Sequence, residues 1–166
     1  MMAEMQRVGT PGPQHAMLAK YAGDFTAECT MWMDPAQPPT KSTGKLHQEM
    51  ALGGRYLMGN FDGDMMGQPF KGMTCTGYDV GKKKWFNGWI DDMSTGLMFA
   101  EGDADASGKT VTLIAGEMYC PQTKGMIKGR EVNKFIDDDT MVMEMYTPGP
   151  DGKEMKSMEI TYKRVK

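Results

Sequence analysis

The stretch TMVMEMYTPGPDGKEMKSMEITYKR, residues 140–164, predicts two β-strands joined by a tight turn. In its first half Met141, Met143 and Met145 alternate with other residues, which is the period-two pattern of a strand. The segment Pro148–Gly152 then supplies the Pro, Gly and Asp residues that favour a turn. Residues 154–164 alternate again. This strand–turn–strand unit is the element from which we predict the fold.

The same unit recurs along most of the chain, with turns such as Asp79–Lys82 and Asp105–Gly108 between segments rich in β-branched, aromatic and Met residues. Ten strands are predicted, at residues 24–33, 42–51, 55–62, 70–79, 84–91, 96–103, 109–117, 126–136, 140–147 and 154–164. Each strand and its turn take about 14 residues, which leaves no room for crossover helices, so neighbouring strands must be antiparallel.

We therefore predict an all-β fold, an antiparallel up-and-down β-barrel of about ten strands, with a two-sheet sandwich as the alternative. A flat meander would expose two long edges, and closure into a barrel removes them. Residues 13–22 predict one short helix, with Met17, Leu18 and Tyr21 on one face, which can plug an end of the barrel. Residues 1–12 are predicted to be a flexible tail, and residues 13–166 a single domain.

Charge and composition narrow the function classes. The net charge of −3 comes without a basic stripe, which argues against a nucleic-acid partner. No apolar run approaches the length of a membrane span, and the first residues lack the apolar segment of a signal peptide. Cys29, Cys75 and Cys120 are widely spaced and predict reduced thiols. We expect a cytoplasmic protein.

Several landmarks resemble the calycin superfamily of β-barrels, which includes lipocalins and fatty-acid-binding proteins. Residues 18–28 resemble the opening helix and first strand of that group, with Phe25 in place of the usual Trp, and residues 160–164 resemble its last strand. Residues 31–35, 52–57, 76–79 and 129–132, taken in order, resemble a bacterial family of unknown function with a lipocalin-like fold. The resemblance implies a barrel and no established reaction, cofactor or catalytic residue.

Methionine is unusually frequent, at 20 of 166 residues. Because its side chain is unbranched and polarizable, it suits a cavity that receives apolar ligands. The alternative is that Met only fills the core in place of Leu. Trp85 and Trp89 share a strand face with Asn87 between them, and they line either the cavity or an oligomer contact.

A few polar residues are candidates to orient a ligand. An inward Arg130 could hold a carboxylate through two hydrogen bonds, or it could form a structural ion pair. Tyr162 and Arg164 keep, in reversed order, the spacing of the Arg and Tyr on the last strand of fatty-acid-binding proteins, although Arg164 also suits a structural position over Phe25. The predicted ligand-binding residues are Arg130, Tyr162, Trp89, Met143, Glu131 and Arg164.

The sequence predicts no catalytic residue, metal or cofactor. Only His15, expected to be exposed or to cap the helix, and His47, expected to face outward, could ligate zinc or haem iron, and they lie far apart. Asp137–Asp139 is interpreted as a solvated hairpin tip in preference to a metal site.

Three functions remain open at this stage. The first hypothesis is a binder of a small, mostly apolar molecule, with an anionic group as one option. The second is an isomerase- or cyclase-type enzyme that uses Glu131, Glu144 or Tyr162 as an acid or base. The third is a filled barrel that forms a homodimer. The sequence favours a binding protein over an enzyme.

Overall fold

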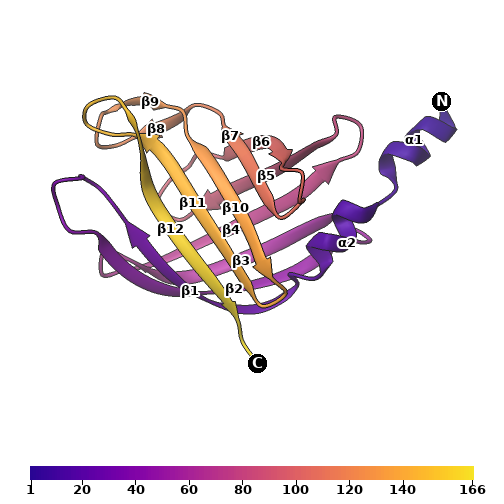
Figure 1. Ribbon diagram of the computed structural model, residues 1–166, viewed down its shortest axis with the longest axis horizontal. Helices are drawn as coiled ribbons and strands as arrows, with labels where there is room; N and C mark the ends of the chain where they lie inside the picture. Colours follow the sequence, from indigo (N-terminus) through magenta and orange to yellow (C-terminus); the bar gives the residue numbers. More distant parts are fainter.

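Ten antiparallel strands form a closed ring in the computed structural model, which describes residues 1–166 (Figure 1). The order around the ring is β1-β12-β11-β10-β7-β6-β5-β4-β3-β2. The predicted up-and-down barrel is confirmed, because the first strand pairs with the last and no edge is left open in the ring.

The strands of the ring lie close to the predicted segments. They are β1 (Gly23–Met31), β2 (Thr40–Ala51), β3 (Tyr56–Met65), β4 (Gln68–Asp79), β5 (Lys84–Asp91), β6 (Met98–Ala104), β7 (Thr110–Ala115), β10 (Arg130–Asp137), β11 (Thr140–Pro148) and β12 (Glu154–Arg164). One prediction is wrong in detail, because residues 126–136 do not form one strand. Their first part belongs to β9 (Gly125–Ile127), which pairs with β8 (Met118–Cys120) in a hairpin outside the ring.

The predicted helix is present as α2 (Pro13–Ala19) at one end of the barrel, opposite the β8–β9 hairpin (Figure 1). Leu18 and Tyr21 are buried in the core, as their shared face predicts. Nδ1 of His15 accepts a hydrogen bond of 3.0 Å from the backbone N–H of Gly12. His15 therefore caps the helix, and it is buried instead of exposed. Burial lowers its pKa.

Residues 1–12, predicted to be a flexible tail, contain a second helix, α1 (Met2–Gly9), which the sequence analysis missed. None of its residues is buried, and it extends away from the barrel beyond α2 (Figure 1). An ion pair between Arg7 and Glu4 joins successive turns of this helix. Neither helix is long and apolar enough to cross a membrane.

The predicted base over Phe25 lies where the first strand pairs with the last. Arg164 stacks on the Phe25 ring and donates hydrogen bonds to the carbonyl oxygens of Ala22, at 2.8 Å, and Asp138, at 2.9 Å. A Cβ atom at Gly23 would collide with the guanidinium, so glycine makes room for it. The structural interpretation of Arg164 is confirmed.

Candidate functional site

The inner face of the barrel is identified by following paired residues from strand to strand. Ala27, 1% exposed, pairs with Tyr162, which pairs in turn with Met141, so all three point inward. Several inward-facing side chains are nevertheless partly exposed: Thr74, Thr76, Asn87, Trp89, Asn133, Met141, Met143, Met158 and Tyr162. These inward-facing residues therefore keep some solvent-accessible surface.

A carboxyl group lies within this interior. Glu131, on β10, is 2% exposed. Its Oε1 accepts a hydrogen bond of 2.6 Å from Asn133 Nδ2. Asn87 Nδ2, on β5, donates to both carboxyl oxygens at 3.2 and 3.3 Å. Because β6 and β7 separate β5 from β10 around the ring, these last bonds cross the interior.

Two threonines fix the orientation of the Asn87 amide. Its Oδ1 accepts hydrogen bonds from Thr74 Oγ1 and, at 3.2 Å, from Thr76 Oγ1, both on β4. The amide nitrogen is therefore directed toward Glu131. The result is a polar network that runs from β4 through β5 to β10 inside an otherwise apolar wall.

No cation compensates the Glu131 carboxyl. Burial raises its pKa, and the hydrogen bonds from Asn133 and Asn87 lower it by less than burial raises it. The nearby titratable group, Tyr162 on β12, has a pKa raised by burial and is neutral near pH 7, and so is Cys29 on β1, which lies near Tyr162. The network thus holds a carboxyl among neutral donors only.

Glu144, a second buried glutamate, shows the opposite arrangement on the outer face. Its carboxylate bonds to Lys134 at 2.9 Å, Lys156 at 3.4 Å and Tyr146 at 3.1 Å. Burial raises the pKa of Glu144, but the hydrogen bonds from Lys134 and Tyr146 and the charges of both lysines outweigh burial and lower it. The two glutamates therefore differ in the cations around them.

The Tyr162 hydroxyl supplies a further polar group. Burial is the main reason that its pKa is raised, and the nearby Glu131 contributes. The hydroxyl makes no hydrogen bond, and yet no side-chain oxygen or nitrogen of the protein is both fully covered and unpaired. The hydroxyl therefore keeps some accessible surface on the inner face.

Both tryptophans of β5 point inward, so they line the interior and not an outer contact. Trp85 is buried, and Trp89 is half-buried in an aromatic group with Phe70 and Phe61, at ring distances of 6.1 and 6.4 Å. Gly72 lies beneath the Trp89 ring, where a Cβ atom would overlap it. The indole is held flat against β4 as a wall.

Of the predicted ligand-binding residues, the structure brings Glu131, Met143, Trp89 and Tyr162 together on the inner face. It does not place Arg130 with them. Arg130 lies on the outer face, stacks on Tyr146 at 4.1 Å and bonds to Glu154 at 2.6 Å, so the inward anion clamp is wrong. The physical reason is strand alternation, because Glu131 takes the inward position of this pair.

Arg164 is inward-facing, but its donors are used by backbone carbonyls at the plugged end. The sequence analysis missed Asn133, Thr74 and Thr76 and gave Asn87 no role of its own. Each stands two residues from another inward residue of its strand, and that spacing was the available signal.

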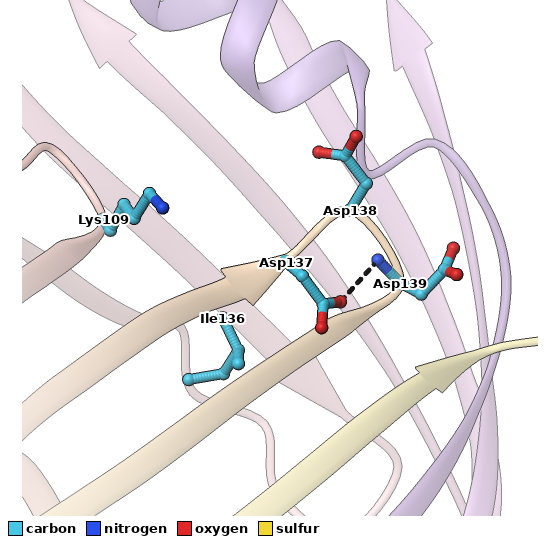
Figure 2. Close-up of a pocket in the computed structure, with 5 residues that line it drawn as sticks. All are labelled: Lys109, Ile136, Asp137, Asp138 and Asp139. Carbon is cyan, nitrogen blue, oxygen red and sulfur yellow. Dashed lines mark hydrogen bonds between the residues drawn. The ribbon is translucent and has the colours of Figure 1, made fainter.

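An open hollow of about 460 Å³ lies elsewhere, over the β10–β11 turn (Figure 2). It is lined by Lys109, Ile136 and Asp137–Asp139, and Asp137 accepts a hydrogen bond of 2.9 Å from the backbone of Asp139. Asp139 pairs with Arg164 and Lys166, each at 3.2 Å. The predicted hairpin tip is confirmed, and these two basic side chains offset negative charge there.

His47 is exposed as predicted and forms a hydrogen bond with Asp24.

Comparison with solved structures supports the fold. The crystal structure of Rv2717c from M. tuberculosis is similar with a TM-score of 0.68 and 12% identity, over 95% of this chain and 100% of that chain. A redesigned β-barrel has 14% identity and a TM-score of 0.46 over 95% and 100% of the two chains. No curated protein matches the sequence. The first of these likenesses shows the fold alone.

A family model extends across nearly the whole barrel. It describes a protein of unknown function, DUF1579, and it matches residues 10–164, from just before α2 to the last residue of β12. The chain therefore belongs to the DUF1579 family.

Proposed function

We propose that this protein binds a small, mostly apolar molecule inside its barrel, in the manner of the lipocalin-like proteins that its sequence resembles. The observation that carries the proposal is the partial exposure of inward-facing Met141, Met143, Met158, Trp89 and Tyr162. A barrel that served only as a scaffold would gain stability from filling this space, because unfilled apolar interior is destabilising.

The lining suits guests of varied shape. Thioether side chains on β11 and β12 adapt to irregular surfaces, and Trp89 supplies a flat aromatic wall. A guest that buries about 300 Å² of apolar surface gains roughly 7 kcal/mol at about 25 cal/mol per Å², before the free-energy cost of association. Such a guest binds in the micromolar range or more weakly.

The outward position of Arg130 removes the support for an anionic group on the guest. We also propose a cytoplasmic location, which the three free cysteines support. The homodimer stays a prediction. Native mass spectrometry of the purified protein tests it and, in the same spectrum, shows any guest that is retained.

A cavity-filling variant tests interior binding directly. Isothermal titration with 1-decanol is expected to show saturable binding to the wild-type protein and none to Met143→Trp, whose larger side chain points inward. Val142→Trp is the matched control, because Val142 is the next residue and points outward, paired with Thr161 and Lys134. Equal decanol binding by both variants would place the site outside the barrel.

A further inference from the structure

We propose that the interior site selects ligands that carry a protonated amine over neutral or anionic analogues, with the Glu131 carboxylate as the counter-ion and Tyr162 as a second acceptor. This inference rests on the proposed interior binding and adds the charge of the guest. The charge of this guest is opposite to that of the anionic guest that Arg130 suggested in the sequence.

The hydrogen bonding of Glu131 leaves a place for such a guest. Oε1 accepts from both Asn133 and Asn87, whereas Oε2 accepts from Asn87 alone. A carboxylate offers about four lone-pair positions, so one acceptor position on Oε2 is unused. Both existing partners are amide N–H groups that suit the ionised carboxylate, and an ammonium N–H would complete its set.

Charge complementarity explains why a cationic guest is preferred over an anionic one. Glu131 forms no ion pair, whereas Lys134 and Lys156 on the outer face are committed to Glu144. Arg164 is held at the plugged end. An ionised carboxyl without a partner is costly in a low-dielectric interior, and a cationic guest removes that cost. A carboxylate guest would add repulsion instead.

The surrounding neutral groups also favour a cation. The unpaired Tyr162 hydroxyl can accept a hydrogen bond from an ammonium group. Trp85 and Trp89 flank Asn87 on the inner face of β5, and the faces of indole rings attract cations. The apolar thioether wall is left to accommodate the alkyl part of the guest.

Proton linkage provides a signature of the charge. The pKa of Glu131 is raised by burial, so an amine that binds the ionised form displaces a proton. Tyr162, which lies near Glu131 on β12, and Cys29, which lies near Tyr162 on β1, stay protonated because their pKa values are also raised. Amine affinity should therefore increase as pH rises through the raised pKa of Glu131, and the affinity for an alcohol should not.

Three probes of equal chain length test the proposal: decylamine, 1-decanol and decanoate, titrated calorimetrically into the wild-type protein. We expect decylamine to bind about tenfold or more tightly than decanol, and decanoate to bind most weakly. Glu131→Gln should bring decylamine to the affinity of decanol. Glu144→Gln is the matched control, since it removes the buried glutamate of the outer face and should keep the order of the probes.

Each outcome decides a different statement. If decanol and decylamine bind equally and Met143→Trp abolishes both, the charge preference is wrong and the interior binding stands. If none of the three probes binds, interior binding and the charge preference fail together. Should Glu131→Gln fail to fold by circular dichroism, the order of the probes on the wild-type protein and its pH dependence still decide the proposal.

Discussion

The guanidinium carbon of Arg164 lies 4.6 Å from the centre of the Phe25 ring, across the pairing of the last strand with the first. The same guanidinium donates to backbone carbonyls of the segment after α2 and of the β10–β11 turn. One side chain thus connects three parts of the chain that are distant in sequence, at the place where the ring closes.

Replacing Arg164 with Ala should therefore destabilise the barrel. Loss of the cation–π contact and of charged hydrogen bonds should lower the free energy of unfolding by about 2–4 kcal/mol, measured by urea denaturation. Lys163→Ala, at the exposed neighbouring position, should change it by less than about 0.5 kcal/mol. Equal effects of the two substitutions would show that Arg164 does not stabilise the closed ring.

The pH dependence of stability should identify Glu131 as a carboxyl that is penalised by burial. Because burial raises the pKa of Glu131 in the folded state above its ordinary value of 4.5, the native state keeps a proton that the unfolded state releases. The free energy of unfolding therefore falls as pH rises from 4.5 to the pKa of the folded state, and Glu131→Gln should remove that fall.

Glu144→Gln gives a control of opposite sign. The folded pKa of Glu144 is lowered, so its stabilising contribution is present at neutral pH and lost as pH falls below about 4.5. Urea denaturation of the three proteins across pH 3–9 separates the two carboxyls. Parallel curves for wild type and Glu131→Gln would contradict the raised pKa.

The hydrogen bonds across the interior should be coupled. Asn87→Ala removes one of the two hydrogen-bond partners of Glu131 and the acceptor shared by Thr74 and Thr76, and it should lower the free energy of unfolding by about 2–3 kcal/mol. Asn60→Ala, at an exposed position of β3, should have little effect. A double-mutant cycle with Glu131→Gln should give a coupling free energy above about 0.5 kcal/mol, and additive effects would show that the two residues act separately.

The three thiols should react at different rates. Hydrogen bonds from the backbone and side chain of Thr123 lower the pKa of Cys120, in the β8–β9 hairpin. Burial raises the pKa of both Cys29 and Cys75. Iodoacetamide at pH 7.5 should therefore label Cys120 first, as peptide mass spectrometry can show. Cys120→Ser should leave only slow labelling, and rapid labelling of Cys29 would mean that the barrel opens readily.

The barrel could be predicted from sequence because its determinants are local. Turn residues recur at short intervals, and period-two patterns mark the strands between them, as in Met141, Met143 and Met145. The three-residue strands β8 and β9 carry too few residues for a pattern, so β9 was merged with β10.

The sequence does not predict which side chains of β10 point inward, and these side chains decide the chemistry of the interior. Glu131 and Val132 are adjacent and both buried, so the strand lacks the alternation that would tell its faces apart. Asn87 and Glu131 are 44 residues apart, and they meet because β5, β6, β7 and β10 are neighbours in one curved sheet. The polar network thus depends on tertiary register, which no local pattern encodes.

Closure by β12 also has a consequence during synthesis on the ribosome. The N-terminal strands are synthesised first. β1 and β11, the two neighbours of β12, each keep an unpaired edge until residues 154–164 have emerged. A nascent chain is therefore an open sheet whose apolar inner face is exposed to solvent or to a chaperone. A premature stop codon before β12 yields an aggregation-prone fragment, however complete the rest of its strands.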